Sequence, residues 1–108
     1  MAGRIIHPNA SEAVATSYSD ALSPLGDTIG VSVNVTDIGT SGTLAVSVEW
    51  SPDGTTCSFG AADSSADTLT TFATAIALSK QLAVKAPFYR VKYVVAVDAV
   101  EFTAAVNE

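Results

Sequence analysis

The chain has 108 residues, 48% of them hydrophobic and 15% charged, and a formal net charge of −6. This length suits one domain with its own core, and the acidic balance makes nucleic acid and anionic membranes unfavourable partners because both are negatively charged. Cys57 is the single cysteine, which excludes an intrachain disulfide. We find no apolar run of membrane length and no basic-then-apolar leader, and therefore expect a soluble protein made in a reducing cytoplasm.

The first eleven residues, Met1–Ser11, show no hydrophobic period and contain Gly3, Pro8 and Asn9. Such a segment is typical of an extended arm that becomes ordered only against another surface. We therefore expect two parts in the chain, an N-terminal arm at residues 1–11 and a β-sandwich domain at residues 12–108.

A first strand is predicted over Glu12–Tyr18, where small residues alternate with Val, Thr and Tyr. The residues that follow, 20–26, contain Pro and Gly and predict a bend. One apolar residue of this bend, Leu22 or Leu25, is expected to plug the end of the core.

The most regular stretch of the sequence predicts a pair of strands, Thr28–Asp37 and Thr43–Ser51. Both alternate β-branched or aromatic residues with small or polar ones, the period that a half-buried strand requires. The segment Ser51-Pro52-Asp53-Gly54 then predicts a turn, since proline presets φ, aspartate bonds to nearby amides and glycine tolerates positive φ.

After this turn the pattern is less regular. A short strand is predicted at Cys57–Gly60, and small and acidic residues predict a loop up to Asp67. Leu69–Ser79 is predicted to be a strand, although apolar residues at helical spacing leave residues 72–85 open between strand and helix.

Two further strands complete the chain. Phe88–Val97 alternates aromatic and β-branched residues with Arg90 and Lys92, Asp98 predicts a tight turn, and Val100–Val106 alternates again. Seven or eight short antiparallel strands separated by turns predict an all-β single sandwich, either immunoglobulin-like or jelly-roll.

No arrangement of residues predicts catalysis, a cofactor or a metal. His7 is the only histidine and is expected to be a solvated residue of the arm, and Cys57 is expected to be a small core residue. The seven aspartates fall mainly at strand ends and loops, where they satisfy backbone amides more often than they bind calcium. We therefore expect a protein that is not an enzyme.

Aromatic residues offer one alternative. Trp50, Tyr89 and Tyr93 would suit a sugar-stacking face, but they lie at the alternating positions assigned to the core, so packing is the favoured interpretation. Arg90 and Lys92 face the other way and are expected to be solvated or paired with acidic residues.

The order of these segments resembles a known family. A Val-rich strand, the segment Thr36–Gly42, the strand Leu44–Trp50 with its SPDG turn, and later Ala86–Tyr93 (APFYRVKY) are similar to the small β-sandwich virion proteins encoded in the structural-gene clusters of tailed bacteriophages. In those proteins a strand ending in (E/Q)-x-SPDG precedes an aPy-R-v-x-(Y/W) strand. The resemblance covers about Thr16–Val106.

Members of this family are capsid decoration (cement) proteins, head fibres, or neck and tail accessories, and none has catalytic residues. The resemblance thus implies a structural virion protein but does not fix its station. We expect a decoration protein on the outer surface of the head, with the major capsid protein of the same virus as its partner and a homotrimer as a possible oligomer. A neck or tail accessory protein and a carbohydrate-binding module of the host-recognition apparatus are the alternatives. The residues expected to contact the partner are those of the arm, namely Arg4, Ile5, Ile6, His7 and Pro8.

Overall fold

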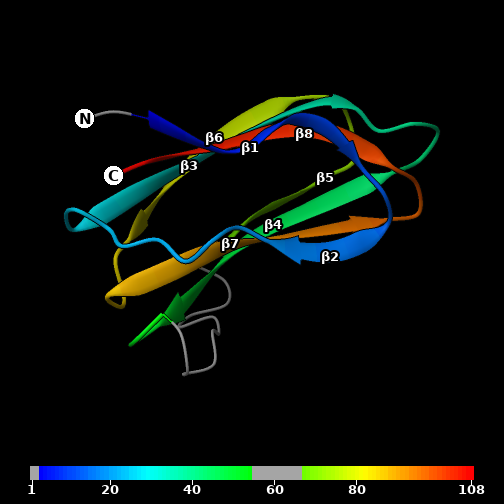
Figure 1. Ribbon diagram of the computed structural model, residues 1–108. Helices are drawn as coiled ribbons and strands as arrows, with labels where there is room; N and C mark the ends of the chain where they lie inside the picture. Colours follow the sequence, from blue (N-terminus) through cyan, green and yellow to red (C-terminus); the bar gives the residue numbers. More distant parts are fainter. Residues whose placement is uncertain (1–2, 55–66) are drawn as a thin grey trace.

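The computed structural model describes residues 3–54 and 67–108, and within them eight strands form two four-stranded sheets packed face to face (Figure 1). One sheet has the strand order β1-β8-β3-β6 and the other β2-β7-β4-β5. The strands are β1 Gly3–Glu12, β2 Ala15–Tyr18, β3 Thr28–Asp37, β4 Thr43–Ser51, β5 Thr68–Phe72, β6 Ala77–Ala83, β7 Phe88–Ala96 and β8 Val100–Asn107.

The strand pairing identifies the sandwich as a jelly roll. β1 pairs with β8, β2 with β7, β3 with β6 and β4 with β5, all antiparallel. This is the arrangement produced when one long hairpin of eight strands is wrapped into two sheets. The predicted antiparallel β-sandwich is confirmed, and of the two topologies expected it is the jelly-roll one.

The core lies between the two sheets and is built by the alternating residues of the central strands. β3, β4, β7 and β8 each turn every second side chain inward, and these side chains are almost fully shielded from solvent. Burying each large apolar side chain stabilises the fold by roughly 1.5–3 kcal/mol. The residues are Ile29, Val31, Val33, Val35, Leu44, Val46, Val48, Trp50, Tyr89, Val91, Tyr93, Val95, Val100, Phe102, Ala104 and Val106.

The turn after β4 forms as predicted, with one change in how it is held. Gly54 has a φ of 73°, the left-handed conformation that the sequence indicated. The buried Ser51 hydroxyl accepts the backbone N–H groups of Asp53 at 3.3 Å and Gly54 at 3.0 Å, so serine supplies the acceptor that we had assigned to aspartate.

Residues 69–79 do not form one strand, and that prediction is wrong. β5 ends at Phe72 in one sheet and β6 begins at Ala77 in the other, so the chain crosses between the sheets over residues 73–76. The helical alternative for residues 72–85 is also wrong, because β6 forms half of that segment and none of it is helical. The short strand predicted at Cys57–Gly60 lies outside the described residues.

The N-terminal arm is the main correction to the fold. Residues 3–12 form β1, which pairs with β8 from Gly3 opposite Asn107 to Glu12 opposite Val100, so no boundary exists at residue 11. The strand predicted at 12–18 is shorter, since β1 ends at Glu12 and β2 begins three residues later. Two register shifts in β1 explain why no alternating pattern was visible in its sequence.

Of the two leucines proposed to plug the end of the core, Leu22 does so. It is buried and forms an isolated bridge with Tyr89 of β7, while Leu25 is exposed. In the described residues no helix is long and apolar enough to cross a membrane.

Candidate interaction surfaces

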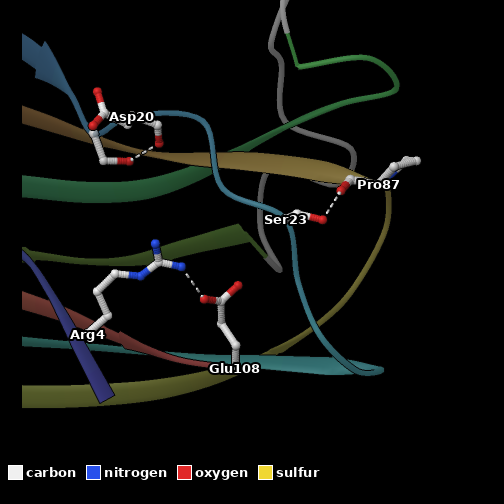
Figure 2. A network of polar contacts seen from close by, with 6 residues as sticks. Arg4, Asp20, Ser23, Pro87 and Glu108 are labelled. Atoms are coloured by element: carbon white, nitrogen blue, oxygen red, sulfur yellow. Dashed lines mark hydrogen bonds and ion pairs between the residues drawn. The ribbon is translucent and has the colours of Figure 1, made fainter. Parts of the chain in front are cut away.

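Arg4, the first of the predicted contact residues, is held by the end of the chain. Its guanidinium donates to the Glu108 carboxylate at 2.8 Å, joining β1 to the residue that follows β8 (Figure 2). The hydrogen bond and charge of Glu108 raise the pKa of Arg4. Burial, and then the nearby Glu108 carboxylate, raise the pKa of the Tyr89 hydroxyl. Arg4 therefore joins the first strand to the end of the chain.

His7 is not the solvated residue that the sequence suggested. Its ring stacks on Phe102 with centroids 3.9 Å apart and planes 9° from parallel, and it also contacts the ring of Tyr93. Nδ1 lies 3.1 Å from the Phe102 carbonyl oxygen and Nε2 lies 2.9 Å from Glu12 Oε1. Both of these oxygens are acceptors, so the ring donates to both only when it carries two protons. His7 is thus a structural residue that fixes β1 to the core.

The remaining residues of the predicted contact segment divide between core and surface. Ile6 is partly buried against the core, whereas Ile5 is 64% exposed and faces outward opposite Ala105 of β8. Pro8 is exposed. Of the five predicted residues, Arg4, Ile6 and His7 therefore use their side chains in contacts within the sandwich, whereas the side chains of Ile5 and Pro8 are exposed to solvent.

A second surface, which the sequence did not reveal, is formed by the turns at the opposite end of the sandwich. The β1–β2, β3–β4 and β7–β8 connections all lie at this end, far from both termini (Figure 1). Val97 is 72% exposed and Val14 is 56% exposed. We call these two residues the apical valines.

Val97 has an unusual backbone conformation. Its φ is 72°, and the N–H of Asp98 donates to the carbonyl of Ala96 at 2.8 Å, so Val97 is the central residue of a γ-turn. The positive-φ form of this turn is rare and strained, and a β-branched residue is among the least suited to it. A strained backbone conformation of this kind lowers the stability of the folded chain, and such conformations are commonly found at functional positions.

Asp98 ties this turn to the neighbouring one. Its carboxylate accepts the backbone N–H groups of Thr40 and Ala99, each at 2.9 Å. These two hydrogen bonds, first that of Thr40 and then that of Ala99, lower the pKa of Asp98. Gly39, with a φ of 65°, leaves room for the carboxylate, since a Cβ there would lie 2.5 Å from Asp98 Oδ2. The tip that carries Val97 is therefore rigidly held.

A third surface is the outer face of the β1-β8-β3-β6 sheet. Two shallow grooves follow β3 and β6, and small uncharged side chains dominate their walls. No aromatic side chain lines either groove in the described structure. The polar and glycine residues along the first groove are Thr28, Gly30, Ser32, Ser79, Gln81 and Asn107, with Lys80 at its side.

The proposed sugar-stacking face does not exist as a surface. Trp50, Tyr89 and Tyr93 are all buried, which confirms the packing interpretation. Of the two interpretations left open for Arg90, solvated or paired, the structure shows pairing. Arg90 bonds to Glu49 at 2.9 Å, and its guanidinium lies over the exposed ring of Tyr18.

Within residues 3–54 and 67–108, no group of His, Cys, Asp and Glu side chains is arranged to hold a metal ion. Cys57 and Asp63 lie outside the described residues. The buried Asp67 carboxylate accepts from the Lys85 ammonium, which joins the start of β5 to the segment after β6.

Neither a protein-family model nor a curated protein matches the sequence. Several solved structures are similar. The crystal structure of the PBSX exported protein XepA has a TM-score of 0.68 and 17% identity over 97% of this chain and 36% of that chain. The C-terminal CBM6 of LamC, a marine laminarinase from Zobellia galactanivorans, has a TM-score of 0.51 and 9% identity over 99% of this chain and 100% of that chain.

A chain in the structure of infectious bursal disease virus, Gx strain, has a TM-score of 0.51 and 8% identity over 97% of this chain and 30% of that chain. The protein thus spans about a third of the XepA and virus chains that it matches. At these identities the similarity establishes the architecture. The chain is a β-sandwich of the kind found in an exported protein, a carbohydrate-binding module and a virus particle.

Proposed function

We propose that this protein is a structural virion protein of a tailed phage. It would be a capsid decoration protein that binds the outer surface of the head non-covalently and stabilises the shell without catalysing a reaction. Two lines support this proposal. The SPDG turn and the APFYRVKY strand carry the resemblance to small phage virion proteins. The fold is also that of XepA and of a chain from a virus particle, which is compatible with such a role.

The observation that carries the proposal is the strained, exposed Val97. A valine at positive φ lowers the stability of the free domain, and its side chain contributes nothing to the core. Val97 lies on a tip that Asp98 holds in place, and Val14, in the β1–β2 connection at the same end of the sandwich, is also exposed (Figure 1). A rigid apolar tip is suited to insert between neighbouring subunits of a shell, where burial of both valines would favour binding.

The first experiment is to measure the copy number of the protein in purified particles of the phage that encodes it, by quantitative mass spectrometry against the major capsid protein. A decoration protein is expected at a ratio near one, or at a simple fraction of it. A few copies per particle would favour the alternative of a neck or tail accessory protein. Absence from particles would contradict a virion role.

The second experiment tests the tip. Val97→Asp places a charge on the apolar projection and is expected to abolish binding to undecorated heads while leaving the fold intact, because the side chain is exposed. Leu25→Asp is the matched control. Leu25 is also an exposed aliphatic residue, but it belongs to the β2–β3 connection, whose Leu22 bridges Tyr89 near the start of β7, whereas Val97 follows the end of β7. Equal binding by both variants would remove the tip from the contact.

The role of the N-terminal residues requires a different experiment from truncation. Deleting β1 would remove His7 from its stack on Phe102, so loss of binding would report on folding. Ile5→Asp changes one exposed residue of β1 instead. Weaker binding by this variant, with unchanged thermal stability, would show that β1 also contacts the shell, and unchanged binding would restrict the contact to the tip.

Carbohydrate binding is the second candidate, favoured by the CBM6 fold and by the polar groove along β3 and β6. Asn107, Gln81 and Ser32 supply amide and hydroxyl groups suited to sugar hydroxyls. The lack of an aromatic wall in the described groove makes this the weaker candidate, since stacking supplies much of sugar affinity. Titration of host-surface glycans, followed by NMR shifts of the Gln81 and Asn107 side-chain amides, would decide it.

A further inference from the structure

The free edge of β6 differs from the other three sheet edges. Exposed edges of β-sheets invite pairing with another strand unless they are short, bulged or interrupted by proline or charge. β1 carries Pro8 and two register shifts, β2 has four residues, and β5 has a register shift against β4. β6 pairs with β3 over its whole length in one continuous register and contains neither proline nor a carboxylate.

The hydrogen bonds to β3 show which backbone groups of β6 are free. The N–H of Val35 donates to the Ile76 carbonyl and the N–H of Val84 donates to the Asp27 carbonyl. In an antiparallel pair these bonds recur at every second residue, so the even-numbered residues of β6 face β3. The N–H and C=O groups of the odd-numbered residues therefore point away from the sheet. These residues are Ala77, Ser79, Gln81 and Ala83, and all four are exposed.

Two large apolar side chains lie on the same edge. Ile76 is 47% exposed and Leu78 is 39% exposed, while Leu82 further along the strand is buried. Lys80, the only charged residue of β6, is directed toward the neighbouring sheet and donates to the Thr68 carbonyl at 3.0 Å. It does not shield the edge as a freely projecting lysine would.

We propose that β6 pairs with β6 of a second copy of this chain, antiparallel and centred on Ser79. In this register Ser79 bonds to its own copy and Ala77 bonds to Gln81, so the outward backbone groups satisfy one another. On the core-facing side, Ile76 lies opposite Leu82 and Leu78 lies against the stem of Lys80. The two sheets become one continuous sheet across a two-fold axis.

Three features select a second copy as the occupant. In this register the two exposed apolar residues, Ile76 and Leu78, are covered by Leu82 and Lys80 of β6 in the second copy. It also avoids the neighbouring register, centred on Lys80, which would place two lysines directly opposite each other. Finally, β6 contains no acidic residue, so a molecule of net charge −6 meets its copy there without opposing carboxylates on the paired strands.

The first test uses the purified protein alone, and its outcome is therefore independent of the proposed virion role. Sedimentation equilibrium over a wide range of concentrations should show a monomer–dimer equilibrium. Ser79→Lys places two lysines at the axis and should raise the dimer dissociation constant at least about tenfold. Ser11→Lys is the matched control, since it makes the same change at an exposed position on the opposite edge of the same sheet, and it should leave the constant unchanged.

The second test fixes the register. Paired residues in such a ladder have Cα atoms about 5.5 Å apart, within the range that a disulfide spans. Ser79→Cys, in a Cys57→Ser background that removes the native thiol, should oxidise to a covalent dimer, whereas Lys80→Cys in the same background should not. Preferential cross-linking through residue 80 would overturn the register.

Three outcomes of the sedimentation experiment would overturn the proposal as a whole. These are a monomer at every concentration, a trimer, or a dimer that Ser79→Lys does not weaken. Thermal melting of each variant, followed by Trp50 fluorescence, ensures that a loss of dimer is not a loss of fold.

Discussion

His7 stacks on Phe102, with ring centroids 3.9 Å apart, and so attaches the edge strand β1 to the aromatic part of the core. Replacing the ring by His7→Ala should lower the free energy of unfolding by about 2 kcal/mol, because the stacking on Phe102 and the polar contacts of the ring with the Phe102 carbonyl and Glu12 are lost. Chemical denaturation measures this change. Pro8→Ala, at the adjacent exposed position, is the control and should change stability by less than about 0.5 kcal/mol. Equal effects would show that the ring is not part of the fold.

Val97→Gly should stabilise the isolated domain by about 1 kcal/mol, since glycine adopts positive φ without the steric penalty that valine carries. Val14→Gly is the control, because Val14 is exposed but has no positive φ, and there glycine should lower stability. Thermal melts compare the two variants. If Val97→Gly destabilises the protein, the γ-turn is not strained and the reasoning that assigns the tip to binding fails.

Gly39→Ala should lower stability by roughly 1–3 kcal/mol, because alanine is strained at a φ of 65° and its Cβ would displace the Asp98 carboxylate. Gly26 offers a matched control. A Cβ at Gly26 meets no atom within 4 Å and its φ is not positive, so Gly26→Ala should be neutral or slightly stabilising. Similar losses for both variants would contradict the role assigned to residue 39.

Asp98 should make the free energy of unfolding depend on pH, so that the protein loses stability in acid. Its pKa is lowered in the folded state, so the folded protein binds a proton less readily there than the unfolded chain does. The contribution is present above the ordinary aspartate pKa and disappears as the pH falls through the lowered value. Asp98→Asn should therefore reduce stability at neutral pH and flatten the acid limb of the stability–pH curve.

Urea unfolding at a series of pH values measures this effect. Asp20→Asn is the control, because in the described part of the chain the Asp20 carboxylate accepts no hydrogen bond. An acid limb that is identical for wild type and Asp98→Asn would show that the two backbone hydrogen bonds do not favour the ionised form.

The sequence predicted the strands whose alternation is unbroken. The bounds predicted for β3 and β4 agree with the structure, and those of β7 and β8 differ by one residue at one end. Each of these four strands buries one face, so every second residue of its sequence is apolar and the strand can be recognised from this period of two. The same reasoning correctly placed Trp50, Tyr89 and Tyr93 in the core.

Where the alternation is interrupted, prediction failed for a physical reason. The two register shifts in β1 place Ile6 and His7 inward in succession, which removes the period from its sequence. Around residues 73–76 the alternation of Phe72 with later residues continues although the chain changes sheets, so one pattern hid two strands. Neither the register shifts in β1 nor the crossing at residues 73–76 is marked by a characteristic residue type in the sequence.

The contact residues expected from the sequence stay a prediction, and the structure shows only how each of them lies. Ile5 and Pro8 were expected at a contact and are exposed, whereas His7 and Arg4 serve the fold. The apical tip was not foreseen, because the positive φ of Val97 depends on how β7 and β8 are joined and valine gives no hint of it. The free edge of β6 likewise depends on which strands have neighbours, and sheet order is a property of the whole chain.

The pairing of Gly3 with Asn107 brings the start and the end of the described chain together, at the end of the sandwich remote from Val97 (Figure 1). A protein or peptide fused at either terminus would thus leave the molecule on the side away from the apical valines. If the tip sits on a shell, both kinds of fusion would face the surrounding medium. The domain would then serve as an adaptor for displaying cargo on particles, with either terminus as the attachment point.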